Sequence, residues 1–293
     1  MSEDKFLEGL KELLCKKMGE GIYIKTQRVR KNNNVVYLGL IIHQEGSNIA
    51  PTLYVNSLYE EYQMGADMED LAERVMESYH QGTVKKDITM DFFLDFEKVK
   101  DRIAYRLINA KMNEELLEDI PHILYLDWAI CFYYAFHDEA IGDGMILIHN
   151  SHMDMWNTNH EELMKLAGVN TPKLFTPLLM SMGDLLKSMR MEQVASNLYI
   201  LTNEQKCQGA VALLYPGMLK KAAELLGGDF FILPSSIHEV LLLKKQEYDD
   251  TDILLDMIDE ANSNHVMEEE ILSNHLYYYD SKQGKMMEVG RSK

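Results

Sequence analysis

Cysteine is scarce in this chain. Only three occur among its 293 residues, namely Cys15, Cys131 and Cys207, and they lie too far apart to form a CxxC redox or zinc motif. Two of them stand in apolar contexts, which favours buried free thiols over disulfides. Because free thiols persist in reducing compartments, we expect a cytoplasmic protein.

Long apolar runs are also missing. The longest extends from Ile123 to Phe136 and is interrupted by Asp127, so it is too short and too polar to cross a bilayer. The first residues carry acids and then charges throughout, which is unlike a signal peptide. The sequence therefore predicts a protein without a membrane span, and we expect no membrane partner.

Basic side chains are outnumbered, with 29 Lys and Arg against 47 Asp and Glu and a formal net charge of −18. This excess repels nucleic acid phosphates and anionic membranes, so nucleic acid is not expected as a partner. The same charge would suit an acidic inhibitor or a mimic of nucleic acid. However, the acids are spread along the chain, as in many soluble proteins.

Common catalytic signatures are absent from the sequence. There is no Walker phosphate loop and no GxGxxG motif, and neither His160-Glu161 nor His238-Glu239 is followed by the second histidine of a zinc protease. No cofactor is therefore expected. These absences weaken the hypothesis of an enzyme without excluding it.

The composition and the apolar patterns predict an α+β protein. Hydrophobic residues make up 46% of the chain and charged residues 26%, which is typical of a globular protein. We expect helices and a hairpin in residues 1–115, and a mixed or mostly antiparallel sheet with flanking helices in residues 116–293. These regions are either two closely packed domains or parts of one domain.

Periodicity places the individual elements. Helices are expected over residues 6–18, 67–79, 92–107, 159–167, 177–189, 217–226 and 251–262. An asparagine turn at 32–34 should join two strands, because asparagine tolerates the left-handed conformation. Further strands are expected over residues 123–136, 145–150, 198–203, 229–234, 238–243 and 275–279.

The stretch "HNSHMD" raises the question of a metal site. His149, His152, Asp154 and His160 are nitrogen and oxygen donors that zinc or another divalent ion accepts. Their spacing permits such a site without requiring it. The segment "TNHE" from Thr158 to Glu161 instead fits a helix-capping box, and an ordered turn is the simpler interpretation.

A hydrolase is the alternative that these polar residues leave open. Its candidates are His149, His152 and Asp154, with Ser236 and His238 brought close by the fold, since a nucleophile needs a nearby base. "PSS" before His238 is also typical of a turn. Asp127 is unusual inside an apolar run, because a buried carboxylate requires a partner; we expect a hydrogen-bonded structural role or a polar crevice.

Four stretches carry a family resemblance: "NNNVVYLGLIIHQEGSNIAPTLYVNSLYEEYQMG", "LLEDIPHILYLDWAICFYY", "ILIHNSHMDMW" and "FFILPSSIHEVLLL". Together and in this order, the chain resembles an uncharacterised Clostridia-type bacterial family catalogued as a domain of unknown function (domain of unknown function 5688). The resemblance covers nearly the whole chain. It implies no reaction, cofactor or catalytic residue.

The leading hypothesis from the sequence is a non-catalytic cytoplasmic interaction or regulatory protein. It is motivated by clear folding signals, missing catalytic signatures and the acidic charge. Its partner would be another protein, and homo-oligomerisation remains open. The binding face would lie around Tyr54, Tyr59 and Tyr62, although helical spacing also predicts that at least two of them belong to the core.

Overall fold

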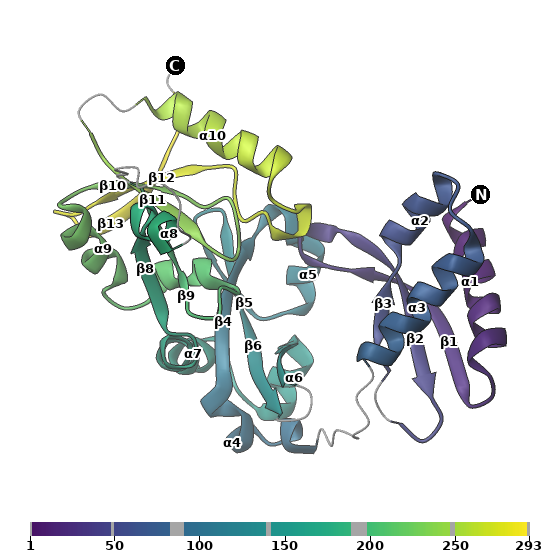
Figure 1. Cartoon of the computed structure of the whole chain (residues 1–293). Coiled ribbons are helices and arrows are strands. Elements are labelled where there is room, and N and C mark those ends of the chain that lie inside the picture. Colours follow the sequence, from purple (N-terminus) through teal and green to yellow (C-terminus); the bar gives the residue numbers. More distant parts are fainter. Residues whose placement is uncertain are drawn as a thin grey trace. The chain divides into compact units, whose positions relative to one another are not determined.

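The computed structural model describes residues 2–47, 50–82, 91–138, 142–188, 198–246 and 250–291 (Figure 1). The chain divides into two compact units. The first contains Met1–Lys31, Val35–Asp91 and His137–Gly142, and the second contains Asn32–Asn34, Phe92–Phe136 and Asp143–Lys293. Both units combine helices with antiparallel strands, which confirms the predicted α+β class.

The first unit is a three-stranded antiparallel sheet with helices packed on it. Its elements are α1 (Glu3–Met18), β1 (Ile22–Arg30), β2 (Val36–Gln44), β3 (Thr52–Tyr54), α2 (Asn56–Gln63) and α3 (Met68–Gly82), with strand order β1-β2-β3. The predicted helices over residues 6–18 and 67–79 are confirmed. Their apolar stripes bury Phe6, Leu10 and Leu71 in one core because these positions recur at helical spacing.

The turn between β1 and β2 follows the predicted asparagine chemistry. Asn33 and Asn34 adopt φ values of 59° and 58°, in the left-handed region that asparagine tolerates. The three turn residues belong to the second unit, where the Asn33 side chain donates to the carbonyls of Glu268 and Ile271. The conformational preference of asparagine therefore forms the turn, and hydrogen bonds to residues 268 and 271 fix its position.

The second unit contains two sheets. A four-stranded sheet has the order β4-β6-β5, with β7 also paired to β6. It comprises β4 (Ile103–Asn109), β5 (His122–Tyr125), β6 (Trp128–Asp138) and β7 (Gly142–Leu147), and the last two residues of β6 and the first of β7 are assigned to the first unit. A six-stranded antiparallel sheet has the order β13-β12-β10-β11-β9-β8. Its strands are β8 (Pro177–Ser181), β9 (Leu198–Asn203), β10 (Phe230–Leu233), β11 (Val240–Lys244), β12 (Leu276–Asp280) and β13 (Lys285–Val289).

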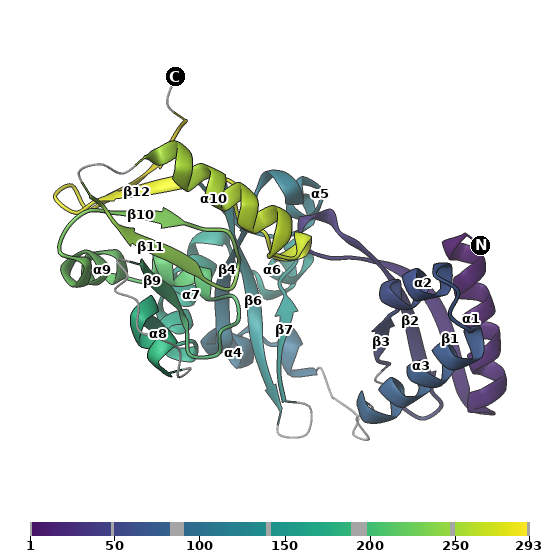
Figure 2. The ribbon, with the colours of Figure 1, turned by 45° about the horizontal axis from the view of Figure 1, so that its top comes forward.

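Helices cover these sheets. The main ones are α4 (Phe96–Val99), α5 (Glu114–Asp119), α6 (Asn150–Trp156), α7 (His160–Leu174), α8 (Met182–Ser188), α9 (Met218–Leu226) and α10 (Thr251–Asn264). Figure 2 shows α10 lying along the sheet beside β12, where Leu255 and Ile258 pack against Phe231. A six-residue 3₁₀ helix, η5 (Gly209–Leu214), is buried beside β9.

Several predicted elements were wrong in type or extent. Residues 92–107 are not one helix: short helical turns end at residue 102 and β4 follows, because residues 103–109 pair with β6. Residues 92–115, which were expected in the N-terminal region, thus belong to the second unit. Residues 177–181 form β8 rather than helix because they pair with β9, and residue 189 lies outside the described residues.

Two boundaries also differ from the prediction. The run 123–136 is not one strand but a hairpin, because Leu126 adopts a φ of 57° and Tyr125 pairs with Trp128. Helix α7 continues past Gly168 to Leu174, since its last turns still bury Thr171. Among the described residues, no helix has the length and apolar character needed to span a membrane.

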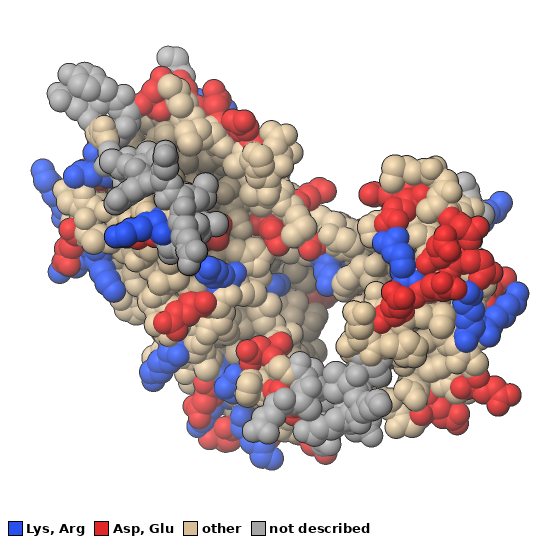
Figure 3. All heavy atoms as spheres, in the orientation of Figure 1, with Lys and Arg blue, Asp and Glu red and all other residues tan. Residues whose placement is uncertain are grey.

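Acidic and basic side chains are mixed on the surface. On the face of the first unit seen in Figure 3, red and blue side chains lie next to one another. The ion pairs of this unit include Arg74 with Glu61 at 2.5 Å and Lys17 with Glu69 at 2.8 Å. Part of the excess acid of this unit is therefore neutralised locally, as in an ordinary exposed surface.

Candidate functional site: a thiol, an imidazole and a carboxylate

The histidines of "HNSHMD" form a helix cap. His149 is the N-cap of α6, and the Nδ1 atom of His152 accepts a hydrogen bond from the His149 backbone N–H at 3.0 Å. The His152 ring packs against Phe93 and Trp156 at centroid distances of 5.0 and 5.7 Å. Burial, together with the neighbouring His149, lowers the pKa of His152, so the neutral ring is favoured.

The other proposed metal ligands do not complete a site with these histidines. Asp154 and His160 are both exposed. The described part of the chain contains no group of three or more His, Cys, Asp or Glu residues arranged to hold a metal ion.

The predicted cap of α7 is shifted by one residue. Asn159, not Thr158, is the N-cap, because the Asn159 side chain accepts from the backbone N–H of Glu162 at 3.0 Å. The Thr158 hydroxyl donates instead to the Glu162 carboxylate at 2.6 Å. His160 is therefore the first residue of the helix.

Ser236 does not contact the imidazole of His238. Its Oγ atom accepts a hydrogen bond from the backbone N–H of His238 at 3.0 Å, which orders the turn before β11. The imidazole itself lies against other groups, so the predicted Ser236–His238 pair supplies no activated hydroxyl.

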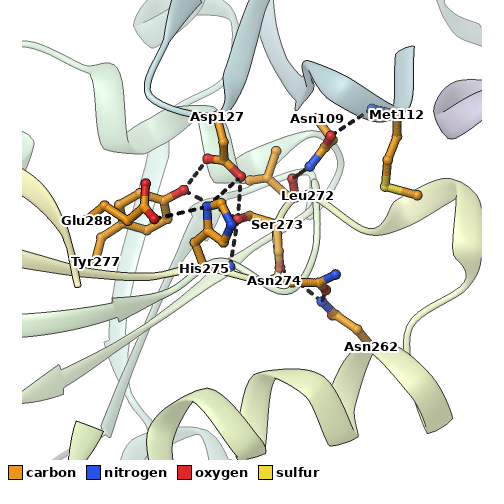
Figure 4. Close-up of polar contacts among 10 residues, drawn as sticks. All are labelled: Asn109, Met112, Asp127, Asn262, Leu272, Ser273, Asn274, His275, Tyr277 and Glu288. Atoms are coloured by element: carbon orange, nitrogen blue, oxygen red, sulfur yellow. Dashed lines mark hydrogen bonds and ion pairs between the residues drawn. The ribbon is translucent and has the colours of Figure 1, made fainter. Parts of the chain in front are cut away.

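Asp127 is the centre of a polar network in the second unit (Figure 4). It lies in the β5–β6 turn, and its carboxylate accepts hydrogen bonds from the hydroxyl of Tyr277 and from Ser273 Oγ, the latter at 2.6 Å. The imidazole of His275 lies 3.5 Å from Asp127 and 3.6 Å from Glu288. The hydrogen-bonded Asp127 expected from the sequence is thus present, in a turn rather than within a strand.

This network is arranged for structure rather than for nucleophilic chemistry. Ser273 is fully buried, donates to Asp127 and accepts the backbone N–H of His275 at 2.9 Å. The imidazole contacts the carboxylates and not the hydroxyl, so no base removes the proton of Ser273. Burial and the hydrogen bond to Asp127 raise the pKa of Tyr277, which therefore remains a neutral donor.

A second polar cluster places Cys207, His238 and Glu270 together. His238 Nε2 lies 3.2 Å from Glu270 Oε1, and His238 Nδ1 accepts the backbone N–H of Gln208 at 3.2 Å. A hydrogen bond with the Cys207 side chain is the main cause that raises the pKa of His238; Glu270 adds to the rise and partial burial opposes it. The imidazole thus lies between a thiol and a carboxylate.

The backbone at Cys207 is fixed by hydrogen bonds to the side chain of Asn203. Asn203, at the end of β9, accepts from the Cys207 N–H at 3.2 Å and donates to the Cys207 carbonyl at 2.7 Å. Gln208 has a left-handed φ of 53°, and η5 begins directly after it. Gly209 is required there because a Cβ atom would lie 2.2 Å from Thr202 Oγ1.

Cys207 is exposed and borders a cavity of about 260 Å³. The same cavity is lined by Arg102, Tyr133, Phe175 and Gln208. Gln208 is only 8% exposed, and its side-chain oxygen has no hydrogen-bond partner among the described residues. The cavity is therefore lined by an accessible thiol, by aromatic side chains and by the Gln208 amide, whose oxygen can still accept a hydrogen bond.

The other cysteines differ from Cys207. Cys131 is buried, and burial raises its pKa to about 12, so its thiol stays protonated. Cys15 is exposed on α1 of the first unit. All three thiols are free, but the expectation of two buried thiols holds for Cys131 alone.

Cys207 and Glu270 were not among the candidates that the sequence suggested. The stretch "NEQKCQGA" is polar on the N-terminal side of the cysteine, which is a signal for an exposed thiol in a turn. Glu270 lies in "MEEEIL" among other acids and has no comparable signal. Only the contacts of His238 distinguish Glu270 from its neighbours.

The fold and the site define an α+β protein with an exposed cysteine beside a histidine–glutamate pair. The sequence model of a family described as a family of unknown function (DUF5688) matches residues 3–281, so the chain belongs to this family. No curated protein and no solved structure matches the chain.

Proposed function

We propose that the chain is a thiol-dependent hydrolase or acyl transferase, with Cys207 as the nucleophile. One observation carries the proposal: an exposed thiol lies beside an imidazole, since His238 Nδ1 accepts the N–H of the next residue, Gln208, at 3.2 Å, while His238 Nε2 meets the Glu270 carboxylate at 3.2 Å. Nucleophile, base and orienting acid are the three parts that cysteine-dependent acyl transfer needs. This assignment replaces Ser236 with Cys207 and keeps His238 from the residues that the sequence suggested.

The roles follow from the contacts. His238 Nδ1, which accepts the backbone N–H of Gln208, releases this hydrogen bond when it takes the thiol proton, and the Nε2–H donated to Glu270 stabilises the resulting imidazolium. The thiolate attacks an acyl carbon, a sulfur–carbon bond forms, and the leaving group departs with the proton from His238. Water, deprotonated by His238, then releases the acyl group and restores the thiol.

The test is the rate at which iodoacetamide alkylates Cys207 in the full chain at about pH 7. A Cys15→Ser background leaves Cys207 as the exposed thiol, because Cys131 is buried. We expect His238→Gln to lower the rate at least about tenfold, because most of an ordinary thiol is protonated at this pH.

The controls separate proton transfer from folding. Ser236→Ala removes a nearby hydroxyl that does not meet the imidazole, and it should leave the rate within about twofold of the background chain. Circular dichroism confirms that each variant folds. A rate that is unchanged in His238→Gln would remove the proposal.

A non-catalytic interaction protein is the second candidate. Tyr54 supports it, because this side chain is 41% exposed and lies over the Lys31 ammonium at 4.4 Å. Tyr59 and Tyr62 do not belong to this binding face, because the centroid of each ring lies 5.2 Å from the ring centroid of the buried Phe6.

The interaction hypothesis has its own comparison. Tyr54→Ala should weaken retention of a protein partner, whereas Tyr23→Ala removes a more exposed ring, 63% accessible, and should not. Equal retention by both variants would contradict this placement. In either case the free thiols support the cytoplasm as the location of the protein.

A further inference from the structure

Arg106 is a half-buried cation that has no partner among the described residues. It lies in the middle of β4, and its Nε atom is buried without a hydrogen bond. No carboxylate or other acceptor in the described part of the chain pairs with its guanidinium, and burial lowers its pKa. Partial burial of a charge without a counterion is unfavourable, so such a guanidinium is suited to an anionic ligand.

The environment of Arg106 places it beside the cavity at Cys207. Arg106 is opposite Cys131 in the β4–β6 ladder, and Ala104, on the same face, is opposite Tyr133. Tyr133 and Cys207 both line the cavity, and both act electrostatically on the Arg106 guanidinium. The unpaired charge is therefore near the proposed nucleophile.

Arg102 adds a second cation to the cavity wall. Its Nε atom donates to the carbonyl of Ala135 at 2.5 Å, which orients the guanidinium. Its terminal nitrogens form no hydrogen bond or ion pair with the residues that the structure describes. Asp143 also lines the cavity, but it takes part in interactions of its own.

We infer that the cavity beside Cys207 accepts an acyl substrate with a second, anionic group, of the carboxylate type, bound by Arg102 at the cavity wall and attracted by the nearby charge of Arg106, which does not itself line the cavity. The terminal nitrogens of Arg102, which have no partner among the described residues, provide a pair of donors that a carboxylate accepts. The apolar walls formed by Tyr133, Phe136 and Phe175 suit the hydrocarbon part of such a substrate. This inference rests on the proposed function because it names the substrate class of the same site.

Iodoacetate and iodoacetamide are matched probes of this site, since they differ in the charge of one small group. The measured quantity is the ratio of their rates at Cys207, from peptide mapping of the full Cys15→Ser chain at low salt. We expect iodoacetate to be favoured at least about tenfold relative to the same thiol in the urea-unfolded chain, because a nearby cation concentrates the anion.

Arg102→Gln should lower this ratio at least about fivefold, and the ratio cancels any change in the thiolate fraction because both reagents share it. Lys206→Gln is the matched control, because Lys206 is an exposed cation next to Cys207 in the chain but does not line the cavity. It should change the ratio less than about twofold. Arg106→Gln should also lower the ratio, and Arg102→Gln keeps the test valid if the Arg106 variant fails to fold.

The outcomes for the two proposals are distinct. A ratio equal to that of the unfolded chain, or an equal loss in Lys206→Gln, overturns the inference even if the iodoacetamide rate depends on His238. A preserved preference for iodoacetate that disappears in Arg102→Gln supports the anion site. If the iodoacetamide rate then proves independent of His238, only the proposed reaction fails.

Discussion

Two clusters in the second unit contain the same kinds of group and differ in what they can do. Asp127, Ser273 and His275 form one, and Cys207, His238 and Glu270 form the other. Each has a carboxylate, an imidazole and a hydroxyl or thiol. In the first cluster the carboxylate lies between the other two groups, and in the second the imidazole lies between them.

The arrangement of the groups and their exposure decide the chemistry. Ser273 is fully buried and gives its proton to a hydrogen bond with Asp127, so it fastens the loop before β12 to the β5–β6 turn. Cys207 is exposed, borders a cavity and has a base beside it. Residue types alone therefore do not identify a nucleophile, whereas geometry and access do.

Loss of turnover should give the largest contrast. Cys207→Ala is expected to reduce hydrolysis of 4-nitrophenyl hemisuccinate at least about a hundredfold, because the covalent step loses its nucleophile. Ser273→Ala should retain the rate within about threefold, since Ser273 is not among the residues that line the cavity. Initial rates of nitrophenolate release measure both, and equal losses would erase the distinction between the clusters.

Stability should show the reverse contrast. Asp127→Asn removes a charged acceptor from Tyr277 and Ser273, both of which are fully buried. We expect the free energy of unfolding to fall by about 2 kcal/mol, because the amide group cannot accept both hydroxyls equally. Urea denaturation measures this change. Glu270→Gln, at the other cluster, should destabilise the chain less while slowing alkylation of Cys207.

The pH dependence of stability isolates His238. Its pKa is raised in the folded state, so its stabilisation is complete below the unfolded pKa of about 6.5 and is lost as the pH rises through the higher folded value. Replacing His238 by Gln should flatten the part of the curve that lies above the unfolded pKa of about 6.5. Urea denaturation midpoints of the unchanged chain and of His238→Gln, measured across this pH range, provide the comparison. If stability depends on pH equally in both proteins, the assignment is contradicted.

The smallest effect is expected at the exposed edge of the first cluster. Glu288 is about half exposed, with 48% of its side chain accessible, and lies 3.6 Å from His275. Glu288→Gln should change the free energy of unfolding by less than about 0.5 kcal/mol, because water screens the pair. A loss as large as that of Asp127→Asn would mean that His275 and Glu288 belong to the buried network.

The fold was predictable in segments whose apolar pattern fits only a helix or only a strand. The stripe of α1 and the asparagine turn before β2 follow from local preferences, and both were found. Residues 92–107 matched a helix through Phe96, Val99 and Ile103, but residues 103–107 also alternate as a strand. Pairing with β6 decided between these patterns, and that partner lies elsewhere in the chain.

The candidate site was only partly predictable. His238 was identified as a candidate base, whereas its partner was taken to be Ser236 because the two are close in sequence. The structure brings together Gln208 and His238, 30 positions apart, and His238 and Glu270, 32 positions apart. Sequence spacing carries no information about such contacts. The first depends on the pairing of β9 with β11, and the second on the bridge between Ser236 and Ile271.

The sequence by itself determined the α+β class, the amphipathic helices, the left-handed asparagine turn and the acidic charge, because these depend on neighbouring residues and on composition. Tertiary structure alone decided which cysteine is exposed, which carboxylate meets His238 and which arginine lacks a partner. Burial and the choice of hydrogen-bond partner arise only when distant segments pack, and these properties separate a structural hydrogen bond from a reactive site.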